Sequence, residues 1–313
     1  FDTFTTVVKS VGCAIIGQTS DLAPADRRLY AIRDVTATVA SIPLITASIL
    51  AKKLAAGLGA LVMDVKVGNG AFMESPERSE ALAKSIINTA ARAGVTTHVL
   101  ITDMNEVLGT TAGNSVEIEE SMRYLRNEKR ESRLNEVVLA LCAEMLVASG
   151  MELDRDAAKR RCEEAVTSGR AAEIFGGMCS ALGGPADFVE NFERYLPRAP
   201  VVRPVHAAGI LVGVDTRAVG NAIIELGGGR HRVGEALDLS VGFTEIAPVG
   251  TSLDADRPLA FVHAASEDDA DRAEDQLRAA CTVSTDAAAE RPVICRIMDS
   301  CCPCFLYPRR QQE

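Results

Sequence analysis

The chain has 313 residues, 47% hydrophobic and 24% charged, which is ordinary for a globular protein with a sizeable core. Its formal net charge of -10 at pH 7 argues against nucleic acid as a partner, because a phosphate backbone attracts basic surfaces. The most basic segment, RNEKRESR at 126–133, mixes Glu and Ser with its cations and therefore predicts a solvated face.

The sequence also argues against a membrane protein and a metal site. No apolar run reaches the length of a membrane span, and VVLALCAEMLVA is interrupted by Glu144. No basic-then-apolar leader opens the sequence, so we expect a cytoplasmic protein. Four of the nine cysteines crowd into CRIMDSCCPC, but no second Cys or His pair accompanies them to complete a metal site.

In the first third of the chain, predicted strands alternate with predicted helices. Nearly continuous apolar runs predict buried strands at 12–17, 60–68 and 97–104. Helices are predicted at about 26–57 and 77–93, the second opened by Ser75 and Pro76. This order is typical of an α/β fold with a central, mainly parallel sheet covered by helices.

The rest of the chain changes character twice. Residues 115–195 are predicted to be mostly helical, with Gly150 as a helix C-cap. After the proline-rich RYLPRAPVVRP, short strand-like runs alternate with predicted helices at 216–226 and 267–280. This alternation of short strands and helices predicts a mixed α+β subdomain.

The segment YAIRDVTATVASIPLITASILAKK, residues 30–53, carries the most informative polar residues. Ser41 is the expected N-cap of a helix, with Pro43 in its first turn. Ser48 and Lys52 are one turn apart and share a face. The expected apolar stripe lies elsewhere on the helix and consists of Leu44, Ala47, Leu50 and Leu54.

This segment predicts a positive pocket. No charged residue occurs from 35 to 50, so we expect the helix to be largely buried and Ser48 and Lys52 to line a cleft. Together with Arg33, Lys52 would suit a planar, partly anionic group that bears carbonyl oxygens. Asp34 would orient either cation or cap the next turn. The alternative interpretation is an amphipathic helix with a solvated lysine.

Two glycine-containing segments are weaker signals. In MDVKVGNGAF a strand ends in Gly68-Asn69-Gly70, which lets backbone approach a ligand at the carboxyl end of a parallel strand, although a tight turn explains it equally well. Phe72 is a candidate apolar wall. ELGGGRHR lacks the spacing of the known phosphate and dinucleotide motifs, so it predicts a turn after a helix. No pair among the four histidines has metal-ligand spacing: His98, His206, His231 and His263.

Several long segments are specific enough to compare with known families. They are GQTSDLAPADRRLYAIRDVTATVASIPLITASILAKKLAAGLGALVMDVKVGNGAFM, DMNEVLGTTAGNSVEIEES, GPADFVENFERYLP, and VDTRAVGNAIIELGGGRHR with LSVGFTEIA. Together they resemble the family of thymidine phosphorylases and pyrimidine-nucleoside phosphorylases, in order and without large gaps, from the first residues to about 297.

The resemblance implies a pentosyltransferase, a kind of glycosyltransferase, that acts in nucleoside salvage and catabolism. Such an enzyme converts thymidine or deoxyuridine and inorganic phosphate reversibly into the free base and 2-deoxy-D-ribose 1-phosphate. The resemblance implies that the residues contacting the pyrimidine base are Arg33, Ser48 and Lys52. It implies pocket walls formed by Tyr30, Val39, Ile45 and Phe72, with Asp34 in support. The two cations would stabilise the negative charge that develops on the leaving ring.

The resemblance also implies a domain organisation. The α/β phosphorylase domain is expected at 1–24 and 56–198, and part of a small helical domain at 25–55. A C-terminal α+β subdomain is expected at 199–297, followed by an atypical, Cys-rich tail at 298–313. The family works by closing the cleft between the helical and α/β domains. A homodimer is expected for the full-length protein.

The family's phosphate-binding motifs do not occur in these residues. A Lys-His-Ser-Thr-Gly-Gly-Val-Gly type loop, with Ser-Gly-Arg-Gly and His-Thr-Gly-Gly-Thr segments, would precede Phe1. We therefore expect an N-terminally truncated chain with no phosphate-binding residue and negligible activity of its own. A non-catalytic fragment that binds a base weakly remains an alternative. A phosphoribosyltransferase of similar architecture is another, against which the base-contacting residues argue.

A cation site is a further expectation from the resemblance. In some family members a monovalent, potassium-like cation bridges the phosphate loop and the positions that match Leu108, Thr111 and Glu120. No cofactor is expected to be required. Glu106 stands where the family usually has Gln.

Overall fold

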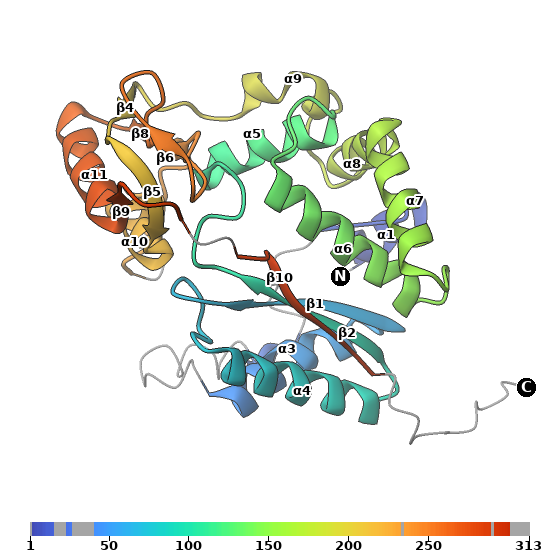
Figure 1. Ribbon diagram of the computed structural model, residues 1–313. Coiled ribbons are helices and arrows are strands. Elements are labelled where there is room, and N and C mark those ends of the chain that lie inside the picture. Colours follow the sequence, from blue (N-terminus) through green and yellow to red (C-terminus); the bar gives the residue numbers. More distant parts are fainter. Residues whose placement is uncertain (1, 16–22, 27–40, 233–234, 289–290, 301–313) are drawn as a thin grey trace, which may run out of the picture.

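The computed structural model describes residues 2–15, 23–26, 41–232, 235–288 and 291–300, and Figure 1 shows their arrangement. The helices are α1 (Asp2–Val11), α3 (Ile42–Ala55), α4 (Pro76–Arg92), α5 (Asn114–Leu125), α6 (Ser132–Ala148), α7 (Arg155–Thr167), α8 (Arg170–Ala181), α9 (Phe188–Tyr195), α10 (Thr216–Glu225) and α11 (Glu267–Ala280). The strands are β1 (Ala60–Val67), β2 (Thr96–Asp103), β3 (Ala112–Gly113), β4 (Val201–Val205), β5 (Gly209–Val214), β6 (Gly242–Thr244), β7 (Ser252–Leu253), β8 (Ala260–Ala264), β9 (Cys281–Ser284) and β10 (Ile294–Asp299).

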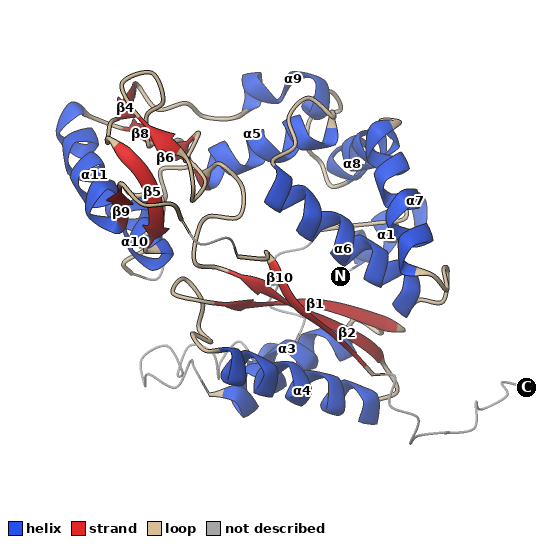
Figure 2. Ribbon diagram, viewed as in Figure 1, coloured by secondary structure: helices blue, strands red, loops and turns tan. Residues whose placement is uncertain are grey.

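The central sheet has the strand order β1-β2-β10. β1 and β2 are parallel, and β10 pairs antiparallel with β2. Helices α3 and α4 cover one face of this sheet and α6 covers the other (Figures 1 and 2). β2 is buried at every position after Thr96, as expected for a strand covered on both faces. The α/β fold predicted from the sequence is confirmed.

The C-terminal part contains two small antiparallel sheets, with the orders β3-β6-β8-β4 and β7-β5-β9. Helices α10 and α11 pack together beside them (Figure 2). Their shared core is apolar and includes the fully buried Leu211, Phe243, Leu259 and Leu277. Helices α5 to α9 form a helical layer, as predicted for residues 115–195.

Most local predictions are confirmed. The helix expected at 77–93 is α4, and Ser75 Oγ accepts a hydrogen bond from the backbone N–H of Arg78 at its start. Gly150 adopts φ 74° just after α6, where a left-handed residue ends a helix. The ELGGGRHR segment is a turn that follows α10.

The strand predicted at 12–17 is wrong for the residues that the structure describes. Helix α1 continues to Val11, and Gly12 follows it with φ 99°. Residues 13–15 have no regular structure, and Ile15 is 69% exposed. A short apolar run becomes a strand only where another strand can pair with it, and residues 13–15 have none.

Two features of the structure bear on whether the protein binds a membrane or nucleic acid. Among the described residues, no helix combines the length and apolar character of a membrane span. The three arginines of the basic segment 126–133 are paired with acids: Arg126 with Glu128, Arg130 with Glu163, and Arg133 with Asp103 and Glu106.

A buried charge cluster joins β2, α6 and α7. His98 Nδ1 lies 2.6 Å from Glu144 Oε2, and both side chains are almost fully buried. Arg155 Nε donates to Glu144 Oε1 at 2.5 Å, and Arg155 also pairs with Asp299 of β10. Glu144 thus joins β2 and α7 to α6, and Arg155 extends the cluster to β10.

Replacing Glu144 with Ala is expected to lower the free energy of unfolding by about 3 kcal/mol, because the buried His98 and the half-exposed Arg155 lose their carboxylate. Urea denaturation measures this loss. The matched control is Glu152→Ala, which breaks the more exposed pair with Arg161 and should cost less than about 1 kcal/mol. Equal losses for the two variants would contradict the stabilising role of Glu144.

Candidate functional site

Ser48 and Lys52 meet on one face of α3, as their spacing predicted. Lys52 Nζ donates to Ser48 Oγ at 3.0 Å and to Asp26 Oδ2 at 2.7 Å. Ser48 and Asp26 are buried, whereas the Lys52 side chain is 28% exposed. A cation held by two partners and still accessible loses little side-chain entropy when it binds a ligand.

Asp26 is the functional candidate that the sequence analysis missed. It lies 26 residues before Lys52, so helical spacing does not connect them. The chain has 43 acidic residues from which a counter-ion to Lys52 would have to be chosen. Only the tertiary structure identifies this carboxylate.

The buried face of α3 differs from the predicted stripe. Three of the four stripe residues are exposed: Leu44, Ala47 and Leu54. The helix packs against α4 and the core beneath the sheet through Ile42, Ile45, Ile49 and Leu50. An uncharged stretch therefore did not make the helix largely buried. A helix that is apolar nearly all round does not mark its own buried face, so the contact with α4 decides it.

The start of α3 also departs from expectation in one detail. Ser41 occupies the N-cap position and Pro43 lies in the first turn, as predicted. The Ser41 side chain, however, makes no capping hydrogen bond. Thr46 on the second turn instead bonds across to α4, with its Oγ1 2.9 Å from Ser85 Oγ.

Two of the predicted pocket walls lie in the described residues. Ile45 packs partly buried against the core cluster. Phe72 is 69% exposed, although Ala71 and Met73 on either side of it are buried. Phe72 is therefore free to contact a ligand. Four other predicted site residues lie outside the described residues, and their roles stay predictions: Tyr30, Arg33, Asp34 and Val39.

Charged side chains gather near the carboxyl ends of β1 and β2. Lys66 Nζ lies 2.7 Å from Asp64 Oδ2 and donates to Thr102 Oγ1 at 2.9 Å. Thr102 in turn donates to Asp64 Oδ1 at 2.5 Å. The carboxyl end of a parallel sheet is where α/β folds place their ligands.

Glu106, the residue that departs from the family pattern, belongs to a neighbouring ion-pair network. Its carboxylate lies 2.9 Å from Arg133, which also pairs with Asp103 at 3.3 Å. The same carboxylate accepts a hydrogen bond from the backbone N–H of Val249 at 2.9 Å. A neutral amide at this position would keep the bond to Val249 but lose the charge that faces Arg133.

The predicted cation positions lie on the loop before β3 and on the neighbouring helix α5. Glu120 Oε1 accepts hydrogen bonds from the Thr110 backbone N–H at 2.7 Å and its hydroxyl at 2.8 Å, while Thr111 Oγ1 donates to Glu120 Oε2 at 2.6 Å. Leu108 lies in the same loop, partly buried. The Thr111 and Glu120 oxygens are hard ligands, which fit a monovalent cation. Across the described ranges, this loop included, no group of three or more Asp, Glu, His or Cys could hold a metal ion.

Cys162 and Cys281 are not candidate nucleophiles. Burial raises the pKa of Cys281 to about 11, and burial together with nearby Cys142 raises the pKa of Cys162 to about 11. Both thiols therefore stay protonated and weakly nucleophilic at neutral pH. The CCPC segment lies outside the described residues.

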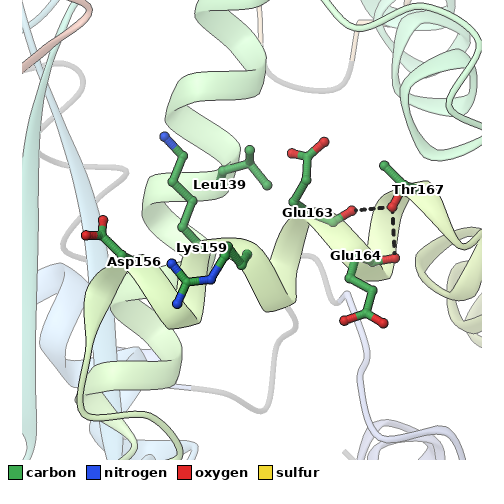
Figure 3. Close-up of a pocket in the computed structure, with 7 residues that line it drawn as sticks. Leu139, Asp156, Lys159, Glu163, Glu164 and Thr167 are labelled. Atoms are coloured by element: carbon green, nitrogen blue, oxygen red, sulfur yellow. Dashed lines mark hydrogen bonds between the residues drawn. The ribbon is translucent and has the colours of Figure 1, made fainter.

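A cavity of about 470 Å³ lies elsewhere, on α6 and α7 (Figure 3). It is lined by Leu139, Asp156, Lys159, Arg160, Glu163, Glu164 and Thr167. The Thr167 hydroxyl is occupied by the backbone carbonyl oxygens of Glu163 and Glu164. The lining mixes both signs of charge and carries no aromatic ring, so it does not suit a pyrimidine.

Two protein-family models match parts of this chain. Residues 1–172, more than half of the chain, match the a/b domain of the glycosyl transferase family. Residues 210–284 match the pyrimidine nucleoside phosphorylase C-terminal domain. The first match contains Asp26, α3, and β1 with the loop that carries Phe72. The second contains α10.

The contact between Asp26 and Lys52 predicts energetic coupling. Asp26→Asn and Lys52→Met are each expected to lower the free energy of unfolding by about 1–3 kcal/mol, because each weakens or removes the charged hydrogen bond of the buried Asp26 carboxylate. The double variant should cost less than the sum of the two by about 1 kcal/mol. Urea denaturation of the four proteins gives this coupling.

The exposed pair Arg170–Glu173 supplies the control cycle, whose coupling should stay below about 0.5 kcal/mol. Strict additivity at Asp26 and Lys52 would show that the contact does not form in solution.

Proposed function

The chain belongs to the pyrimidine-nucleoside and thymidine phosphorylase family of pentosyltransferases, and on that premise we propose that it supplies the base-binding half of a thymidine phosphorylase. In this reaction, phosphate attacks C1′ of thymidine or deoxyuridine and the bond from C1′ to the base breaks. The bonding electrons leave with the pyrimidine, and the products are the free base and 2-deoxy-D-ribose 1-phosphate.

The observation that carries the proposal is that two buried partners hold Lys52 on α3. Lys52 is held by Ser48 and Asp26 and remains partly accessible, so it is already oriented when a base arrives. The leaving pyrimidine gains negative charge as the glycosidic bond breaks. A fixed cation next to a ring oxygen or nitrogen stabilises the transition state more than the neutral nucleoside.

The other predicted residues complete the same arrangement. Arg33 would donate a second charged hydrogen bond to the ring, and Ser48 would set the orientation of the ring. Phe72 and Ile45, with Tyr30 and Val39, would cover its faces. Asp26 would keep the Lys52 ammonium in place during bond breaking, because the charged hydrogen bond of 2.7 Å between them fixes the position of the amine.

The phosphate site is a separate question. The phosphate-binding motifs that the family resemblance implies do not occur among the 313 residues. We therefore expect the 313-residue polypeptide to bind a pyrimidine but not to turn it over. Phosphate-dependent release of thymine from thymidine by this polypeptide would overturn that expectation.

A monovalent cation is the proposed cofactor of the loop around Glu120. Thr111 and Glu120 would supply oxygen ligands, and the cation would hold the loop in place without entering the chemistry. We expect the melting temperature of the wild type to be higher in K⁺ than in tetramethylammonium at equal ionic strength. The melting temperature of Glu120→Ala should be the same in both salts.

Isothermal titration of the 313-residue chain with thymine tests the base site. Lys52→Met should weaken binding by roughly 10-fold to 100-fold, because a charged hydrogen bond is lost, and Ser48→Ala by roughly 3-fold to 10-fold. Lys53→Met is the matched control, since Lys53 is the adjacent residue and is exposed, and it should bind like the wild type. Undiminished binding by Lys52→Met would refute the proposed role of Lys52.

A further inference from the structure

The loop that carries Phe72 is fastened to α10 by the side chain of Asn69. Asn69 Nδ2 donates to the backbone carbonyl of Val214 at 2.7 Å, and Asn69 Oδ1 accepts from the backbone N–H of Thr216 at 3.0 Å. The backbone N–H of Asn69 donates to Asn105 Oδ1 at 3.1 Å. One amide side chain therefore bonds to both sides of the junction between β5 and α10.

A second side chain fastens the loop next to Phe72. The Arg217 guanidinium, in the first turn of α10, donates to the backbone carbonyl of Ala71 at 2.8 Å. It also lies 3.1 Å from the Glu74 carboxylate. Arg217 thus contacts residues on both sides of Phe72.

Steric contact reinforces these bonds. A Cβ atom added to Gly70 would lie 2.8 Å from Thr216 Cβ, so the loop backbone presses directly on the start of α10. Such a separation is shorter than carbon atoms tolerate, and only glycine fits there. Because the chain on both sides of Phe72 is held, the exposed ring projects from a fixed backbone.

We propose that Asn69 and Arg217 are positioning residues of the base pocket, through which the C-terminal part of the chain holds Phe72 in place. This inference rests on the proposed function, in which Phe72 is a wall against the pyrimidine. A fixed ring offers its face to the base without first losing conformational freedom. Freeing the loop makes the ring lose that conformational freedom on binding, so it weakens the affinity of the pocket for the base.

The chain contains no tryptophan, so Phe72→Trp introduces a single fluorescent indole at the site. In that background, Arg217→Met and Asn69→Ala remove the two anchors. Arg272→Met is the matched control, because Arg272 pairs with Asp269 within its own helix, α11. Time-resolved anisotropy and acrylamide quenching report the mobility and exposure of the introduced indole, and its fluorescence titrates thymine binding.

The expected result is greater mobility and quenching of the indole in both anchor variants, with thymine affinity weakened roughly threefold to tenfold. Arg217→Lys, which retains a donor, should recover part of that affinity. Arg272→Met should change none of these quantities. Circular dichroism at the titration temperature confirms that each variant is folded.

Unchanged mobility of the indole in the anchor variants overturns the inference, whatever the thymine titration shows. Greater mobility with unchanged thymine affinity also overturns it, because the loop then does not position the wall of the pocket. A wild-type chain that binds no thymine overturns the proposed function instead, and the anisotropy result still decides whether the anchors hold the loop.

Discussion

β1 and β2 run parallel through eight consecutive pairs, from Ala60 opposite Thr96 to Val67 opposite Asp103. Parallel strands have their carboxyl ends at the same edge of the sheet, so the loops that follow both strands emerge together. One of these loops carries Asn69 and Phe72, and the other carries Asn105 and Glu106. The hydrogen bond from Asn69 to Asn105 joins them directly. The position of the candidate site therefore depends on this pairing.

Helix α3 places the charge of Lys52 in a partly buried position. A buried ammonium is costly unless oxygen atoms replace its lost hydration. Asp26 and Ser48 supply two such atoms to Lys52. A charge arranged in this way does not have to reorganise when negative charge appears on a leaving group, which is why fixed charges are effective in catalysis.

The sequence predicted the features that depend on neighbours along the chain. Hydrophobic continuity located β1 and β2, Ser75 and Pro76 marked the start of α4, and the spacing of Ser48 and Lys52 predicted their contact. Features that depend on distant residues were not predictable. The run at 12–17 looks like a strand until the absence of a partner for residues 13–15 is known.

Asp26 and Asn69 show the same limit within the candidate site. Asp26 is one carboxylate among many in the sequence, and only folding brings it to Lys52. Asn69 lies between two glycines, and a tight turn was a sufficient explanation of that sequence. Its partners at Val214 and Thr216 are about 145 residues away, so the sequence alone does not reveal an anchor.

The C-terminal part of the chain is joined to the sheet edge at several points. Glu106 accepts a hydrogen bond from Val249, Asn69 bonds to both sides of the β5–α10 junction, and Arg217 reaches back to Ala71. These contacts lie at the same edge as the candidate site, not at the opposite end of the strands. Any motion of the C-terminal part relative to the sheet must break them. The loop with Phe72 and α10 therefore move as one unit, and a cleft that closes over a base has to draw its motion from elsewhere in the chain.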